Sequence, residues 1–208
     1  MRPIPSYRLY REKSGESGDF WIHSETIPER SHLHEWEISP HRHDSFFQIF
    51  CLHTGKGEID GDDGTQRFSA PCAIFIPPGA VHGFRWSRDA DGLVVTALGD
   101  RLRSLAAADR QLAAFAAATR IVALAPGNAD ASLVTDCVNK LHRELSGRAS
   151  CRLLLLEPLM TAALVGLVRA GDAAAGAESG PDDRDRRRTE MLATLVAAHF
   201  RERRPVRF

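Results

Sequence analysis

The chain has 208 residues, enough to bury a substantial core in one domain with an appendage or in two small domains. Its formal net charge is zero, from 27 Lys and Arg against 27 Asp and Glu, which excludes binding of nucleic acid through a strong overall positive field. The N-terminal stretch MRPIPSYRLYREKSG has no apolar signal-peptide core, and no stretch reaches the uninterrupted apolar length of a membrane span. We therefore expect a cytoplasmic protein without a membrane partner. Its widely separated cysteines predict reduced, mostly buried thiols.

The first hundred residues have the pattern of short strands. Stretches rich in β-branched and aromatic residues alternate with Gly, Asp and Pro, and their close spacing predicts an all-β sandwich or barrel over residues 1–100. The sequence IDGDDGTQ predicts a hairpin, because its Asp-Gly steps tolerate positive φ. The predicted strands are FWIHSET, HLHEWEISP, FFQIFCLH, KGEIDG, TQRFSA, CAIFIPP, HGFRWS and LVVTAL.

After about Leu102 the apolar residues recur at helical spacing. The segment ADASLVTDCVNKLHREL predicts one helix, with Asp130 or Ser132 as its N-cap. The segment CRLLLLEPLMTAALVGLVRAG predicts a second helix that ends at Gly171. Because a proline inside a helix removes one backbone hydrogen bond, Pro158 either kinks this helix or stands at its first position.

The second helix carries an apolar stripe at positions 153, 156, 160, 163, 164 and 167, close to a seven-residue period. This period is typical of a seam between two helices of a dimer. The alternative is that the stripe packs on the barrel, and both readings stay open at this point. We predict a helical dimerisation region over residues 101–170.

The rest of the chain predicts a linker and the start of another domain. Small and charged residues, GDAAAGAESGPDDRDRRRTE, are typical of a flexible linker over residues 171–189. An amphipathic helical pattern then begins within residues 190–208, and we expect it to belong to a further domain.

Polar residues that can bind a ligand concentrate at two places in the β half. His41 and His43 lie two apart, so their side chains share one face of a strand. Gln48 has the opposite parity and joins them only if the chain bends near residues 44–45. His82 lies in a later strand and alternates with aromatic residues. The aromatic walls of this site are expected from Phe46, Phe50, Phe84 and Trp86.

These groups allow two kinds of chemistry. Three imidazoles suit Zn²⁺, Ni²⁺ or Cu²⁺, so His41, His43 and His82 are the metal ligands if a metal binds. Gln48 offers only a neutral amide oxygen, so Mn²⁺ or Fe²⁺ would be held less well. Without metal, the imidazoles can donate to a carboxylate and, when charged, attract it. We expect a small, flat, acidic ligand and no required cofactor.

The spacing of these residues resembles the cupin family. His41, His43 and Gln48, followed by Gly55, match the first cupin motif, with glutamine at its acidic position. The stretch PPGAVH, which ends at His82, matches the second motif, Pro-x-Gly-x-x-His. The resemblance implies an α+β chain, in which a cupin-like double-stranded β-helix (jelly-roll) barrel precedes the helical region. It also implies that the three histidines correspond to the cupin metal ligands.

A wider resemblance covers roughly residues 20–208. The stretches ERSHLHEWEISPHRHDSFFQIF, APCAIFIPPGAVHGFRW and LVAAHFRERRPVRF look like the effector domain of AraC/XylS-type transcription activators, in the PobR-like branch that responds to hydroxybenzoates. The resemblance implies a barrel that binds a small aromatic acid and a helical region that forms a homodimer. Promoter DNA would be bound only through a C-terminal helix-turn-helix domain, of which residues 190–208 resemble the truncated start.

Two other functions compete with this one. A metal-dependent cupin enzyme, a dioxygenase or isomerase, would act on a small organic acid through a metal with open coordination positions. The glutamine in place of a carboxylate counts against it. A dimeric interaction module with a vestigial pocket is the third hypothesis.

Overall fold

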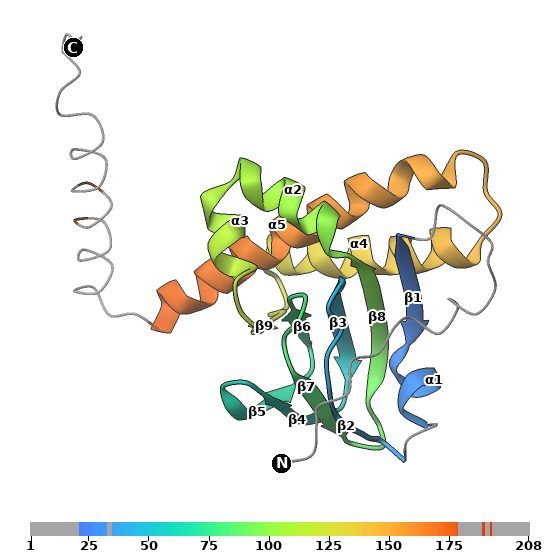
Figure 1. Ribbon diagram of the computed structural model, residues 1–208, viewed down its shortest axis with the longest axis vertical. Helices are drawn as coiled ribbons and strands as arrows, with labels where there is room; N and C mark the ends of the chain where they lie inside the picture. Colours follow the sequence, from blue (N-terminus) through green and yellow to red (C-terminus); the bar gives the residue numbers. More distant parts are fainter. Residues whose placement is uncertain (1–20, 33–34, 179–188, 190–191, 193–208) are drawn as a thin grey trace, which may run out of the picture. The chain divides into compact units, whose positions relative to one another are not determined.

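Two antiparallel sheets face each other in the part of the chain that this computed structural model describes, residues 21–32, 35–178, 189 and 192 (Figure 1). The first sheet has the order β1-β8-β3-β6-β9, and the second has the order β2-β7-β4-β5. Both belong to a compact unit, Met1–Gly171, and the remaining residues form a second unit. The strands are β1 Ile22–Thr26, β2 Glu37–His41, β3 Phe46–Thr54, β4 Lys56–Gly61, β5 Gly64–Ser69, β6 Cys72–Ile76, β7 His82–Trp86, β8 Asp91–Leu98 and β9 Arg120–Ala123.

Seven of the eight predicted strands are present with small shifts at the ends. The predicted strand HLHEWEISP is only half correct, because His32 ends a helix, Glu35 and Trp36 form a turn, and the strand begins at Glu37. The predicted hairpin is the β4–β5 turn, where Gly61 pairs with Gly64 and Gly64 has a φ of +93°. Together with the helices that follow, the two facing sheets confirm the predicted α+β class and its barrel.

A short helix, α1 (Ile27–His32), interrupts the region that we expected to be purely β. Its start is held by a capping box, because the Glu29 backbone N–H donates to Thr26 Oγ1 and the Thr26 N–H donates to Glu29 Oε2. The helix joins β1 to β2, which are edge strands of different sheets. It therefore spans one side of the barrel, and Ile27 packs in the barrel interior.

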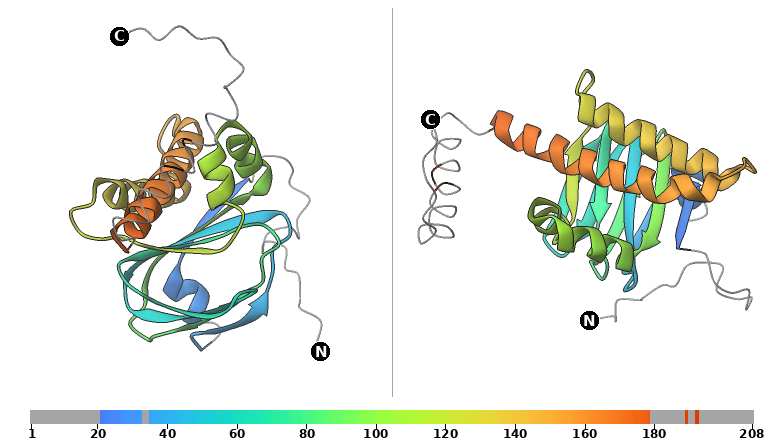
Figure 2. Two further views of the ribbon diagram at one scale, coloured as in Figure 1. Left: turned by 90° about the vertical axis from the view of Figure 1, so that its left-hand side faces the viewer. Right: turned by 90° about the horizontal axis from the view of Figure 1, so that it is seen from above.

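A helical layer covers the outer face of the first sheet (Figure 2). On β3, Phe47 and Ile49 pack toward this layer, whereas Phe50 and Leu52 pack toward the barrel interior. The alternation is what a strand buried on both faces requires. The helices are α2 Gly99–Ala108, α3 Arg110–Phe115, α4 Ala129–Ser146 and α5 Arg152–Glu178.

Several helical predictions need correction. The region expected to be helical also contributes strand β9, which pairs with β6 and extends the first sheet. Helix α4 is capped by Asn128, whose side chain accepts hydrogen bonds from the Asp130 and Ala131 N–H groups, and not by Asp130 or Ser132. Helix α5 does not end at Gly171 but continues to Glu178, and Pro158 lies in its interior.

The apolar stripe of α5 packs within its own chain. Positions 156, 160, 163, 164 and 167 are at most 2% exposed and belong to the cluster between the helices and the first sheet. The packing alternative is therefore confirmed for these positions, and only Leu153, at 62% exposure, faces outward. By length and composition alone, Arg152–Ala173 could cross a membrane, contrary to our expectation, but this buried face is that of a core helix. The linker and the last predicted helix lie mostly outside the described residues.

Candidate functional site

Three histidines meet inside the barrel where the ends of β2 and β7 pair. His41 is the register partner of His82, and His43 follows β2 directly. Their ring centroids are 4.3 Å apart for His41 and His82, 5.0 Å for His41 and His43, and 5.6 Å for His43 and His82. All three side chains are buried, and one nitrogen of each lies within 4.8 Å of the others. The geometry fits a single small ion or one polar group of a ligand.

Backbone carbonyls orient two of these rings. His41 Nδ1 lies 2.9 Å from the Ser39 carbonyl oxygen, and His82 Nδ1 lies 3.0 Å from the Ala80 carbonyl oxygen. In the neutral tautomer that these partners favour, Nδ1–H donates and Nε2 keeps its lone pair. His82 Nε2 is buried and has no hydrogen-bond partner among the residues that the structure describes. Its lone pair is therefore available to a metal ion or to a ligand hydroxyl, and such a carbonyl-held imidazole is the usual arrangement of a metal-binding histidine.

Burial determines the charge of His82. Desolvation, followed by the proximity of His41, lowers the pKa of His82 to about 3. His82 is therefore neutral at neutral pH. Of the two modes considered for the imidazoles, His82 therefore has the uncharged one and acts as a neutral hydrogen-bonding group.

Gln48 faces the barrel interior from the opposite sheet. The chain turns at Asp44 and Ser45, as expected, and passes there from β2 in the second sheet to β3 in the first. Gln48 Nε2 donates to Thr96 Oγ1 on β8 at 3.1 Å, while Gln48 Oε1 is buried and finds no partner in the described part of the chain. The sequence analysis missed Thr96, although a single hydroxyl two residues from Val94 on the same face of an apolar strand could have indicated it.

Aromatic rings fill the interior beyond His82. Phe84 stacks on Trp86 with centroids 4.5 Å apart, and Phe50 lies 4.7 Å from Phe84. Phe68 on β5, which we had not predicted, lies 5.1 Å from Trp86. Phe46 is also buried but has no place in this ring cluster. The expected aromatic walls thus contact one another, and a ligand between them must separate the rings.

A cavity of about 210 Å³ opens at the side of the barrel where β5 and β9 are the edge strands. None of the eight predicted site residues lines it. It adjoins the histidine cluster through Ala80, whose carbonyl accepts the His82 hydrogen bond. The cavity is lined by Ile59, Gly61, Asp62, Asp63, Gly64, Gln66, Pro77, Ala80, Ala117, Ala118 and Thr119.

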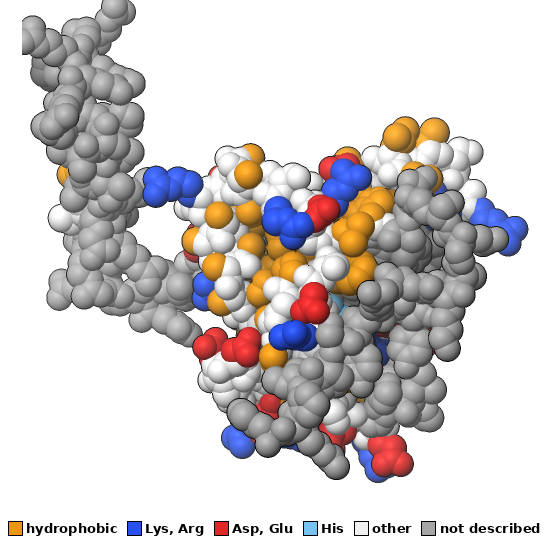
Figure 3. Space-filling model, in the orientation of Figure 1, with side chains coloured by type: hydrophobic (Ala, Val, Ile, Leu, Met, Phe, Trp, Pro, Cys, Tyr) orange, Lys and Arg blue, Asp and Glu red, His pale blue; other side chains and the backbone are white. Residues whose placement is uncertain are grey.

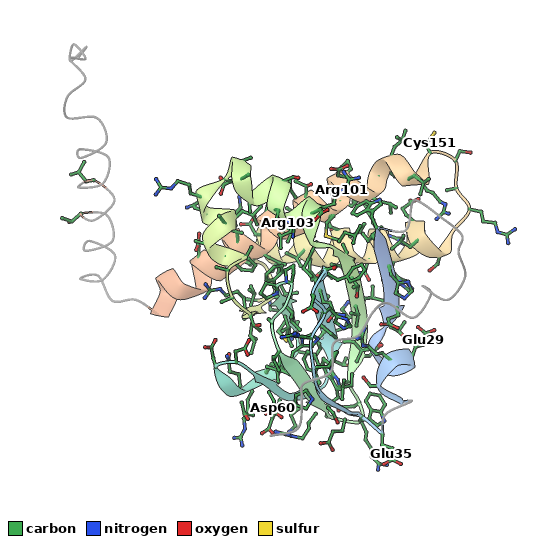
Figure 4. The ribbon with its side chains drawn as sticks, viewed as in Figure 1. Glu29, Glu35, Asp60, Arg101, Arg103 and Cys151 are labelled. Carbon is green, nitrogen blue, oxygen red and sulfur yellow. The ribbon has the colours of Figure 1, made fainter. Side chains whose placement is uncertain are left out.

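Two arginines next to the histidine motifs, Arg42 and Arg85, lie on the outside of the barrel. Arg85 pairs with Glu58 and with Asp60 on the exposed face of the second sheet, where Figure 4 labels Asp60. Arg42 pairs with Asp44 and is about half exposed. A different arginine is more enclosed: Arg30 on α1 is 19% exposed.

Comparison with known proteins places this geometry in a family. The family model described as AraC-like ligand binding domain matches residues 25–163, which include all the site residues above. The chain belongs to this family. It is therefore a ligand-binding domain of the AraC-like type, which favours a regulator over an enzyme.

Similar solved structures include regulators and cupins. The AraC-like transcriptional activator CuxR shares 13% identity over 58% of this chain and 42% of its own, with a TM-score of 0.44. ToxT from Vibrio cholerae, bound to (E)-4-(8-methylnaphthalen-1-yl)but-3-enoic acid, shares 9% identity over 73% of this chain and 58% of its own, with a TM-score of 0.39. A predicted oxalate decarboxylase from Thermotoga maritima shares 16% identity over 37% of this chain and 80% of its own, with a TM-score of 0.29. This chain thus spans about half the length of the two regulators, and no curated protein matches it.

Proposed function

We propose that this chain is the ligand-sensing and dimerisation part of an AraC-type transcriptional activator that responds to a small aromatic acid. The proposed effector is 4-hydroxybenzoate, 3-hydroxybenzoate or a similar acid. The protein would act in the cytoplasm and control the genes of aromatic-compound catabolism. Promoter DNA is bound through the C-terminal helix-turn-helix domain that residues 190–208 would begin.

The observation that carries the proposal is the pairing of two groups inside one barrel. A buried polar cluster of His41, His43, His82 and Gln48 lies next to stacked rings. Convergent hydrogen-bonding groups beside aromatic walls are the usual components of a small-molecule site.

Thermal unfolding of the 208-residue chain, treated with a chelator, tests this function against a panel of aromatic acids. A ligand at a hundred times its dissociation constant stabilises the folded state by about 2.7 kcal/mol. For a domain of this size, that raises the midpoint by roughly 5 to 10 °C. The rise should occur with one or two isomers and disappear in the His43→Ala/His82→Ala double variant. Full affinity in a folded double variant would end the assignment.

A second function is favoured by the histidine cluster itself. A metal-dependent cupin enzyme that acts on a small organic acid would hold Zn²⁺ or another divalent ion at His41, His43 and His82. The metal would supply Lewis-acid chemistry. Two features fit such an ion: the lone pair at His82 Nε2 and the Gln48 Oε1 atom, which accepts no hydrogen bond from the described residues. Stoichiometric metal together with turnover would support the enzyme, whereas acid binding by the chelated protein supports the sensor.

The proposed homodimer needs an exposed apolar surface that is not already packed against the barrel. Hydrophobic side chains gather on the helical side of the molecule (Figure 3), and three consecutive leucines at the start of α5 are among the exposed ones. Leu153, Leu154 and Leu155 are 62%, 75% and 48% exposed. A cluster of this kind is typical of a contact with another chain. Sedimentation of Leu154→Glu should give a monomer with an unchanged melting midpoint, and a variant that still sediments as a dimer would place the contact elsewhere.

A further inference from the structure

Helix α1 presents one face to the barrel interior. Ile27, Arg30 and Ser31 are spaced three and four residues apart, so they lie on the same side of the helix. Ile27 is 1% exposed and belongs to the interior cluster that contains Phe84 and Trp86. The left view of Figure 2 shows α1 within the outline of the two sheets. Arg30 and Ser31 thus belong to the face of α1 that closes the barrel.

Ser31 is a buried donor without a protein partner. It is 1% exposed, and its Oγ makes no hydrogen bond within the described residues. Trp86 Nε1, in the same interior cluster, is also buried without one. The backbone keeps these two residues near each other, because Trp36 donates to the Ser31 carbonyl and accepts from the Trp86 N–H, both at 2.9 Å. A buried hydroxyl without a partner costs about 1 to 3 kcal/mol, so these donors indicate a ligand group at this end of the barrel.

Arg30 supplies a permanent positive charge beside these donors. A guanidinium stays protonated at every physiological pH and offers five N–H donors that match a carboxylate. The Arg30 side chain is 19% exposed, and its Nη1 forms an ion pair with Glu25 Oε1 on β1 at 2.6 Å. Glu25 is the register partner of Val94, which belongs to the barrel-interior cluster, so the ion pair lies on the inner side of the first sheet.

We propose that Arg30 binds the carboxylate of the effector, with Ser31 Oγ–H as a second donor, and that the carboxylate replaces Glu25 as the partner of Arg30. The assignment rests on the proposed function, and it orients the ligand. The acid group lies at α1, and the imidazoles and Gln48 receive the other polar end. It also makes Glu25 a competitor, because its carboxylate occupies the same guanidinium in the free protein.

The experiment compares acids with their uncharged amides on the whole 208-residue chain. Titration calorimetry with 4-hydroxybenzoate and 4-hydroxybenzamide, and with the 3-hydroxy pair, gives an acid-to-amide affinity ratio for each variant. Because both probes bind the same folded protein, a general loss of stability does not change the ratio. Arg85→Gln, which removes an exposed guanidinium outside the barrel, is the matched control.

Arg30→Gln should lower the acid affinity about tenfold to a hundredfold, the value of a charge-assisted hydrogen bond, and leave the amide affinity unchanged. Glu25→Gln should raise the acid affinity about two- to fivefold, because the competing carboxylate is removed from a half-buried pair. If Arg30→Gln does not fold, Arg30→Lys replaces it, and the less well matched ammonium should still lower the ratio.

The outcomes separate this inference from the proposed function. A wild-type chain that binds a hydroxybenzoate while Arg30→Gln binds it equally well refutes the role of Arg30 and leaves the sensor intact. A tighter acid complex in Glu25→Gln together with a weaker one in Arg30→Gln supports the exchange of partners. A wild-type chain that binds none of the acids overturns both the effector class and the assignment of its carboxylate.

Discussion

Acidification should destabilise this fold through His82. The imidazole has a pKa near 6.5 in the unfolded chain and about 3 in the folded protein, where it is 1% exposed. Between these values the unfolded state binds more protons than the folded state, so the free energy of unfolding falls as the pH falls. The contribution of His82 is complete above about pH 6.5 and is lost progressively down to about pH 3. The slope reaches about 1.4 kcal/mol per pH unit, which gives a loss of about 2 kcal/mol between about pH 7 and about pH 5.

Thermal melts of the chelator-treated protein across this range measure the effect. A loss of about 2 kcal/mol lowers the midpoint by roughly 4 to 8 °C in a domain of this size. His82→Gln should have a correspondingly flatter pH dependence, whereas His53→Gln, at an exposed position on β3, should behave like the wild type. The reasoning is refuted if the wild-type midpoint is constant between these pH values, or if His82→Gln loses as much stability as the wild type does.

Three further predictions concern the site and the layers around it. Gln48→Glu adds a carboxylate to three imidazoles and should raise the affinity for Mn²⁺ by about tenfold or more in a calorimetric titration; an unchanged affinity would place Gln48 outside the metal-binding set. Phe84→Ala removes the ring at the centre of the aromatic cluster and should reduce the free energy of urea unfolding by about 3 to 5 kcal/mol, and a loss below about 1 kcal/mol would contradict tight packing there. Asn128→Ala deletes the N-cap of α4 and should lower the free energy of unfolding by about 1 kcal/mol, which corresponds to roughly 2 to 4 °C in the melting midpoint. An unchanged midpoint would contradict a stabilising role of this cap.

Local patterns in the sequence predicted most of the fold. The alternation of apolar and polar residues, together with the turn residues between them, located the strands, because both signals can be read from a short stretch of sequence. Helix α1 was missed although the TIPE stretch, from Thr26 to Glu29, has the form of a capping box. Strand β9 is harder to predict, because four residues carry little pattern and are held by pairing with a distant strand, β6.

The candidate site was predicted in part for a similar reason. The histidines at 41, 43 and 82 were grouped by motif spacing, and the structure places them together. Partners that arrive from other strands, such as Thr96 and Phe68, cannot be inferred from spacing, since a strand pattern does not say which of its two faces lines the barrel. Arg30 was missed for a different reason. Its place on the inner face of α1 follows only once that helix is known, and the sequence analysis did not include it.

Strand β3 gives the molecule a short route between its two apolar compartments. Gln48 and Phe50 face the barrel interior, and Phe47 and Ile49, their immediate neighbours in the chain, face the helices. Because one backbone carries both sets, any shift of β3 that alters the barrel interior also moves the surface on which the helical layer rests. In the proposed sensor, a change at the binding site would therefore have to cross only the thickness of a single sheet to reach the helices.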